Sequence, residues 1–114
     1  TKDHSYVQQL LDKGDITIDE YQNHPNKNVI TKALGIADIP EPDIFEITLD
    51  FCGYIMLCTD GLTNMLDEAN ILNIINQETE LEEKVRELVK KANEAGGTDN
   101  ITIILIKADR KLEE

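Results

Sequence analysis

The first thirty residues combine short helical patterns with polar loops. Ser5 and Thr17 are each followed three residues later by Gln or Glu, which fits the capping box: a hydroxyl and a longer side chain satisfy free backbone N–H groups at a helix start. Gly14 ends the first pattern, and the His-Pro pair at 24–25 follows the second. The sequence predicts two short helices, and the apolar face of the first comprises Val7, Leu10 and Leu11.

Between residues 29 and 59 the spacing changes from helical to strand-like. Residues 29–34 fit either a strand or a helix end, and 36–42 is a loop punctuated by proline. Phe45, Ile47 and Leu49 alternate with polar residues, which predicts a half-buried strand. Residues 54–59 are almost continuously apolar, which predicts a central strand. The short connection at 50–53 predicts that these two strands form an antiparallel hairpin.

The second half of the chain shows two amphipathic helices and a last strand. Asp67 is placed to cap the first helix, while Thr79 with Glu82 forms a capping box for the second. The glycine pair at 96–97 ends that helix, and residues 101–106 are a β-branched run that predicts a buried strand. The expected core positions are Ile71, Leu72, Ile74 and Ile75 in the first helix and Leu81, Val85, Leu88, Val89 and Ala92 in the second.

Composition narrows the class of protein. With 114 residues, 40% hydrophobic and 30% charged, we expect one globular α+β domain over residues 1–114. A formal net charge of -12 argues against binding nucleic acid or an anionic membrane, because like charges repel. A negative net charge also suits a protein that binds divalent cations, although most chains with this charge balance are simply soluble acidic proteins. No apolar run approaches the roughly 20 residues that span a bilayer, and no signal peptide opens the chain.

Two further features concern compartment and completeness. Cys52 and Cys58 lie in or beside an apolar run without CxxC spacing, so we expect reduced, packed thiols in a cytoplasmic protein. The chain begins with Thr1 rather than Met, which suggests a piece of a longer protein.

Two aspartates occupy positions suited to metal binding. Asp60 follows the predicted strand at 54–59, and Asp99 precedes the one at 101–106. If these strands pair antiparallel, both carboxylates emerge at the same edge of the sheet, next to glycines. Carboxylate oxygens are the ligands that Mg²⁺ and Mn²⁺ prefer. From spacing alone, ordinary turns remain the simpler interpretation, because Asp, Asn and Gly dominate turns.

Four stretches together resemble the motifs of PP2C-type protein phosphatases, and of their bacterial branch in particular. CTDGL at 58–62 resembles the family's "(S/T)DGL" motif, and GTDNIT at 97–102 resembles its terminal "GxxDNxT" motif. TKDHS at 1–5 and HPNKNVITKALG at 24–35 resemble "TxDHS" and "HPxxNVITxALG", which bracket a mobile flap over the active site in bacterial members. They occur in the family's order and cover nearly the whole chain.

The resemblance implies a fold and an activity. It implies the C-terminal half of an α-β-β-α sandwich with antiparallel sheets, including a helical flap at about residues 5–28. It implies hydrolysis of phosphoserine and phosphothreonine in proteins, with two or three Mn²⁺ or Mg²⁺ ions activating water. By similarity, Asp60 and Asp99 hold metal, Asn100 orients Asp99, and Gly61 supports the site. Partners implied are a phosphoprotein and, in bacteria, an opposing Ser/Thr kinase.

The flap residues carry weaker implications. His4 lies near the flap in the bacterial branch and is a candidate for proton transfer to the leaving alkoxide. The interpretation we favour is that it caps or packs at the first helix, beside the N-cap Ser5. Asp3 in the same way is expected to help fix the helix start rather than to bind metal. Lys27 stands where the family often has Arg and lacks its bidentate fork.

The departures from the family bear on activity. The early motifs that supply a bridging aspartate, a glycine carbonyl and a phosphate-gripping arginine are absent. We therefore expect little or no phosphatase activity from this chain alone, and self-association or domain swapping through uncovered sheet surfaces. Two alternatives remain: a non-catalytic PP2C-like binding or regulatory module, and the related stage-specific bacterial phosphatases. The latter generally lack the flap, so the helical segment argues against them.

Overall fold

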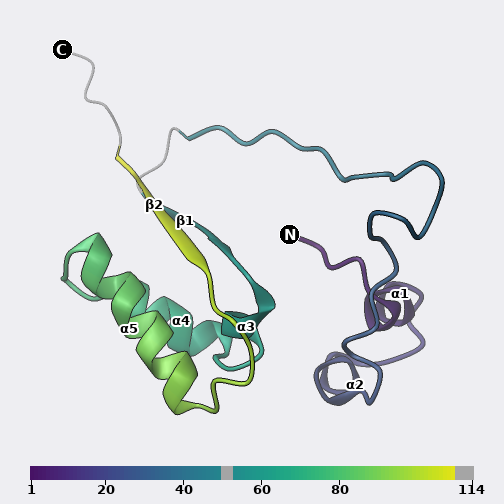
Figure 1. Ribbon diagram of the computed structural model, residues 1–114, viewed down its shortest axis with the longest axis horizontal. Coiled ribbons are helices and arrows are strands. Elements are labelled where there is room, and N and C mark those ends of the chain that lie inside the picture. Colours follow the sequence, from purple (N-terminus) through teal and green to yellow (C-terminus); the bar gives the residue numbers. More distant parts are fainter. Residues whose placement is uncertain (50–52, 110–114) are drawn as a thin grey trace. The chain divides into compact units, whose positions relative to one another are not determined.

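The computed structural model describes residues 1–49 and 53–109, and the chain divides into two compact units, Thr1–Glu46 and Ile47–Glu114. Figure 1 shows the order of the elements. The first unit holds the helices α1 (Tyr6–Asp12) and α2 (Ile18–Asn23). The second unit holds β1 (Gly53–Cys58), α3 (Asp60–Thr63), α4 (Glu68–Ile75), α5 (Leu81–Glu94) and β2 (Ile103–Ala108).

Both predicted helices of the first unit form, with the predicted caps. The Ser5 hydroxyl accepts a hydrogen bond from the backbone N–H of Gln8 at 3.2 Å. The side-chain amide of Gln8 donates to Asp12 instead of returning to the cap, so only half of this capping box forms. Thr17 forms a complete capping box at α2. Each cap satisfies a backbone N–H that has no partner within its helix.

A short antiparallel contact joins the start of α1 to the segment at 29–31. Ser5 forms an isolated bridge with Ile30, and the backbone N–H of Thr31 donates to the carbonyl of His4 at 2.9 Å. The ambiguous stretch at 29–34 is therefore neither a full strand nor a helix end. The chain turns directly after it at Gly35, whose φ of +90° is a conformation that glycine adopts readily.

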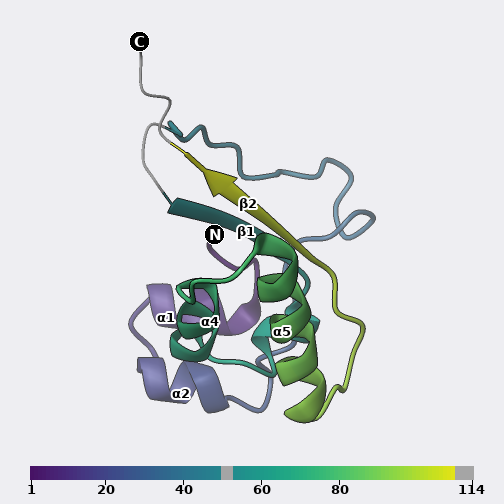
Figure 2. The same cartoon turned by 90° about the vertical axis from the view of Figure 1, so that its left-hand side faces the viewer.

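The core of the second unit lies between the helices and one face of the β1–β2 pair. In Figures 1 and 2, α4 and α5 lie on the same side of the strands. This arrangement follows from the amphipathic pattern, because each helix must bury its apolar stripe. The buried core residues are Leu62, Leu66, Ile71, Ile74, Ile75, Leu88 and Ala92, and Tyr54, Met56, Met65, Ile101, Ile103 and Leu105 pack against them.

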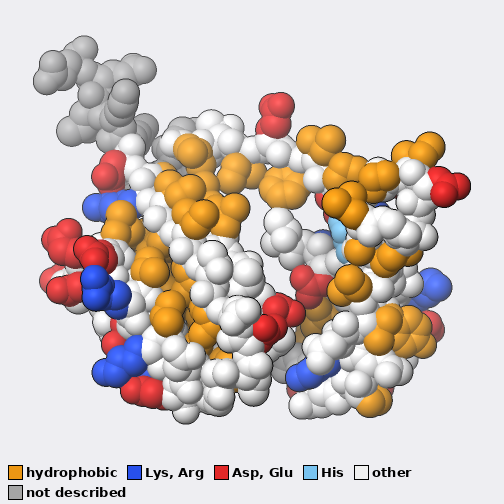
Figure 3. Space-filling view, in the orientation of Figure 1, with side chains coloured by type: hydrophobic (Ala, Val, Ile, Leu, Met, Phe, Trp, Pro, Cys, Tyr) orange, Lys and Arg blue, Asp and Glu red, His pale blue; other side chains and the backbone are white. Residues whose placement is uncertain are grey.

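The β1–β2 pair is antiparallel, in a register that runs from Gly53 opposite Ala108 to Cys58 opposite Ile103. Successive side chains alternate between the two faces. The face away from the helices, here called the outer face, carries Ile55, Leu57, Ile104 and Ile106. Leu57 is 53% and Ile104 56% exposed. Figure 3 shows hydrophobic side chains at the surface of both units.

The predicted strand at 45–49 is wrong. These residues have no regular structure and are all exposed. A strand is stable only when a neighbour satisfies its N–H and C=O groups, and among the described residues β1 pairs with β2 alone. The predicted hairpin is thus absent, and residues 50–52 of its connection lie outside the described residues.

Several finer predictions in the second unit are also wrong. Leu72 is 49% exposed, because it lies off the stripe that buries Ile71, Ile74 and Ile75. The N-cap of α5 is Glu80, without a side-chain cap, in place of Thr79. The last strand is only half-buried, since nothing in the described residues covers the outer face. Cys58 is exposed rather than packed, and partial burial raises the pKa of its thiol; Cys52 lies outside the described residues.

Within the described ranges, every helix is too short or too polar to cross a bilayer.

Candidate functional site

Thr59 joins the end of β1 to the approach to β2, through its backbone N–H and its hydroxyl. The backbone N–H of Thr59 donates to the carbonyl of Thr102, and the Thr59 hydroxyl accepts from the Thr102 N–H, both at 3.1 Å. The same hydroxyl donates to the carbonyl of Asn100 at 3.3 Å. These three bonds, here called the Thr59 clasp, continue the strand pairing beyond Cys58 and fix the segments that carry Asp60 and Asp99.

Gly61 brings the two segments into direct backbone contact. It is buried in α3, and a Cβ at this position would stand 2.1 Å from the Asn100 carbonyl oxygen and 2.9 Å from the carbonyl carbon. Real Cβ atoms do not approach backbone that closely, so only glycine fits without a shift. The sequence placed Gly61 near the site, and the structure shows its physical role as the point of closest approach.

Each candidate ligand directly precedes a residue of this contact, Asp60 before Gly61 and Asp99 before Asn100. Asp60 is the first residue of α3, with Thr59 as its N-cap in an extended conformation. Asp99 lies in the loop before β2, and one of its oxygens accepts from the backbone N–H of Asn100 at 2.7 Å. Both side chains are exposed. The contact of Asn100 with Asp99 is made by its main chain, and its carbonyl belongs to the Thr59 clasp.

The donor set fits part of a divalent-cation site. Two exposed carboxylates on neighbouring segments offer the hard oxygen ligands that Mg²⁺ and Mn²⁺ take. Among residues 1–49 and 53–109, however, no group of three or more His, Cys, Asp or Glu side chains is arranged to hold an ion. A site built on Asp60 and Asp99 therefore requires ligands beyond those that the described residues supply.

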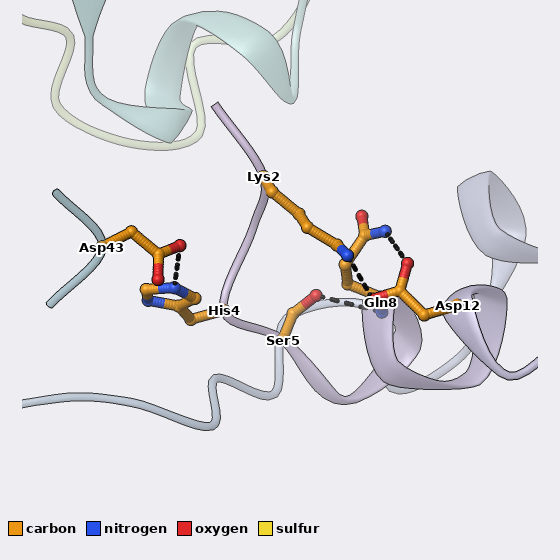
Figure 4. Close-up of polar contacts among 6 residues, drawn as sticks. All are labelled: Lys2, His4, Ser5, Gln8, Asp12 and Asp43. Atoms are coloured by element: carbon orange, nitrogen blue, oxygen red, sulfur yellow. Dashed lines mark hydrogen bonds and ion pairs between the residues drawn. The ribbon is translucent and has the colours of Figure 1, made fainter. Parts of the chain in front are cut away.

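The candidate residues of the first unit make different contacts, drawn in part in Figure 4. The His4 imidazole lies 2.7 Å from the Asp43 carboxylate, through Nε2 and Oδ2. A hydrogen bond from His4 lowers the pKa of the Asp43 carboxyl below its ordinary value. The capping role expected for His4 belongs to Ser5 alone.

Asp3 fixes the N-terminal segment to α2 rather than to α1. Its carboxylate accepts a hydrogen bond from the Tyr21 hydroxyl at 2.9 Å. Burial and this carboxylate raise the pKa of Tyr21. Lys27 is exposed, and its backbone N–H donates to the carbonyl of His24. Asp3 therefore contacts the second helix, whereas the expectation was that it helps to fix the start of the first.

Sequence reasoning missed two residues of these arrangements. Thr59 lies in the CTDGL stretch, but a hydroxyl residue before an aspartate is a common turn pattern. Only the hydrogen bond from Thr102 shows that the Thr59 hydroxyl joins two segments. Asp43 stands 39 positions from His4 in a loop rich in proline, and no local pattern connects the two.

Comparison with known proteins gives related bacterial phosphatases. The chain is 40% identical to the serine/threonine phosphatase stp of Listeria monocytogenes over 109 residues, 96% of this chain and 43% of that protein. It is 40% identical to the protein phosphatase PhpP of Streptococcus pneumoniae over 111 residues, 97% of this chain and 45% of that protein. The chain therefore spans less than half the length of these relatives. No protein-family model matches it.

Solved structures agree with the sequence comparison. The serine/threonine phosphatase of S. agalactiae is 43% identical with a TM-score of 0.85, covering 92% of this chain and 43% of that one. The catalytic domain of the phosphatase PstP, solved with two manganese ions, is 31% identical with a TM-score of 0.72, and the match covers 96% of this chain and 44% of that one. The chain is a homologue of the bacterial PP2C-type serine/threonine phosphatases and corresponds to a part of their length.

Proposed function

We propose that this chain is the C-terminal part of a metal-dependent phosphatase whose intact form hydrolyses phosphoserine and phosphothreonine in proteins. The observation that carries the proposal is the contact at Gly61 and the Thr59 clasp, which holds the segments of Asp60 and Asp99 together. The family's α-β-β-α sandwich, with residues 5–28 as its flap, and a phosphoprotein substrate opposed by a Ser/Thr kinase belong to the same proposal.

Each residue of the site has a distinct part. Asp60 and Asp99 would hold Mn²⁺ or Mg²⁺, in a site of two or three ions in the intact protein. When bound, such ions activate water for attack at phosphorus and offset charge on the phosphoryl oxygens. The backbone N–H of Asn100 orients the Asp99 carboxylate, since its hydrogen bond fixes one oxygen. Gly61 and Thr59 keep the two carboxylate-bearing segments in register.

The activity test compares this chain with its parent protein. We expect no manganese-dependent hydrolysis of p-nitrophenyl phosphate by the chain alone, because two carboxylates bind a divalent ion weakly. We expect hydrolysis once the rest of the parent is supplied in cis or in trans. In that protein, Asp60→Asn or Asp99→Asn should lower kcat/KM about 100-fold or more. Replacing a residue that only orients a metal ligand already lowers metal affinity or activity about 10- to 100-fold.

The matched control is Asp67→Asn. It makes the same chemical change at an exposed position of the second unit, and asparagine keeps the cap that Asp67 gives to Asn70. This variant should retain the parent's activity. An intact parent that hydrolyses no phosphoester, or one unaffected by Asp60→Asn and Asp99→Asn, contradicts the proposal and favours a non-catalytic module.

We also propose that the isolated chain self-associates through the strand pair. In the described residues, β1 and β2 pair only with each other, so each leaves one edge of unpaired N–H and C=O groups. The outer face adds exposed apolar side chains directly beside these edges. A second copy can pair with an edge and cover the face, whereas the net charge of -12 opposes association.

Sedimentation velocity over a range of concentrations tests this. Above the dissociation constant we expect dimers or larger species, and higher salt should favour them by screening the repulsion. Leu57→Lys should shift the distribution toward monomer, because a charge on the outer face cannot be buried without a partner. Asn73→Lys adds the same charge at an exposed position of α4 and should leave the distribution unchanged. A monomer at every concentration and salt level would rule out the association.

A further inference from the structure

An ion pair in the first unit joins residues that lie far apart in the chain. His4 Nε2 and Asp43 Oδ2 are 2.7 Å apart, and 39 positions separate them. The two nearby lysines have other partners: Lys2 pairs with Asp12 at 2.7 Å, and Lys32 donates to the Glu41 carbonyl. Figure 4 shows the imidazole directed at the Asp43 carboxylate, away from the Lys2–Asp12 pair.

The main chain of His4 is fixed independently of its ring. The His4 carbonyl accepts from Thr31, Ser5 bridges to Ile30, and the Tyr6 N–H donates to Val29. These contacts hold the backbone at His4 and directly after it. They leave the imidazole orientation to be decided by its own partner, and that partner is Asp43.

The surroundings of the ring differ on its two sides. His4 lines an apolar pocket, whose walls include Ala33, Leu34, Ile36 and Ile39. It also lines a polar pocket with Lys2, Asp3 and Asp43. The His4 side chain is 32% exposed, so it is neither buried in the core nor free in solvent. A half-sheltered imidazole with a fixed carboxylate partner is the arrangement that proteins use to control a proton on histidine.

The chemistry of the pair fixes where the proton sits. An ionised carboxylate can only accept a hydrogen bond, so the proton of the contact belongs to His4 Nε2. The other nitrogen, Nδ1, is then the one that gains or loses a proton. We propose that Asp43 is a positioning residue that holds the His4 imidazole with its proton on Nε2 and leaves Nδ1 for proton exchange.

The contact with His4 changes the pKa of the Asp43 carboxyl. A hydrogen bond from His4 and its charge lower the pKa of Asp43 below 3.8, with smaller contributions from Lys32 and Lys2. Because the pKa of Asp43 is lowered, the contact with His4 stabilises the folded state at pH values above the ordinary pKa of a carboxyl group. That stabilisation is lost as pH falls through the lowered pKa. The Asp43 carboxylate is therefore ionised at neutral pH and can accept the hydrogen bond from His4 Nε2.

Nuclear magnetic resonance on this chain tests the proposal without any assay of phosphatase activity. We expect a slowly exchanging proton on His4 Nε2, lost in Asp43→Ala and retained in Asp43→Glu, which keeps a carboxylate. In His4→Ala, the carboxyl carbon of Asp43 should titrate at a higher pH than in the wild type. Asp12→Asn, which removes the neighbouring carboxylate, should change neither signal.

His24 is an internal control. Its Nδ1 accepts from the backbone N–H of Asn26 at 3.0 Å, so its proton placement has a separate cause and should be the same in every variant. The α1 amide signals report whether each variant is folded. The proposal is overturned if the Nε2 proton survives in folded Asp43→Ala, or if the titration of Asp43 is the same with and without His4. Failure of the parent's phosphatase assay would leave both results untouched.

Discussion

Gly61→Ala is expected to lower the free energy of unfolding of the second unit by about 3 kcal/mol, the upper part of the usual range for an overpacked site. The added methyl group would lie 2.1 Å from the carbonyl oxygen of Asn100. That oxygen also accepts from Thr59, so it cannot move away without breaking a hydrogen bond. A flexible side chain could rotate to relieve such a clash, and a fixed backbone cannot. Urea unfolding followed by far-ultraviolet circular dichroism measures the loss.

A second glycine in the same unit is the matched control. Gly97 has a φ of +54°, and a Cβ there would come 3.0 Å from a side-chain oxygen of Asn93. Gly97→Ala should cost about 1–2 kcal/mol, the price of a left-handed conformation for a residue with a Cβ. Equal losses for the two variants, or a neutral Gly61→Ala, would show that α3 does not contact the Asn100 backbone so closely.

Leu88→Ala should cost about 3 kcal/mol in the same measurement, within the range of 2–5 kcal/mol for removing a buried leucine side chain. Leu88 is fully buried in α5. It belongs to the core shared with α4 and with Leu62 of α3. Truncation removes apolar contacts and leaves a cavity at the centre of that core.

Leu72→Ala makes the same change on α4, where the side chain is 49% exposed. Its loss should stay within about 0.5 kcal/mol, as for most surface substitutions. Comparison of the two variants separates the effect of burial from the effect of replacing leucine with alanine. If Leu72→Ala proved as costly as Leu88→Ala, α4 would be rotated about its axis relative to this structure.

The helix starts could be predicted from sequence because their physics is local. Ser5, Thr17 and Asp67 each satisfy a backbone N–H within three residues, and that contact needs no tertiary information. Thr79 is not the cap, because α5 begins one residue later with Glu80 as its N-cap, and Lys84, buried in the first turns of α5, donates to the Gln77 carbonyl. The loop before the helix is thereby fixed by a contact that the capping pattern does not include.

Strands were harder to predict because pairing is not local. The alternation at 45–49 is a valid strand pattern, yet no described segment lies beside it to complete the hydrogen bonds. The run at 54–59 and the run at 101–106 did pair, and this pairing was the condition for Asp60 and Asp99 to emerge at the same edge of the sheet. That pairing predicted the neighbouring positions of the two segments, whereas the Thr59 clasp and the His4–Asp43 contact needed coordinates.

Within residues 1–49 and 53–109, the outer face is uncovered and two strand edges are unpaired, which has a consequence for the lifetime of this polypeptide in a cell. Chaperones and proteases act on chains that display apolar surface and open backbone. Turnover would therefore depend on how quickly that surface is covered, by further parts of a parent protein or by another polypeptide.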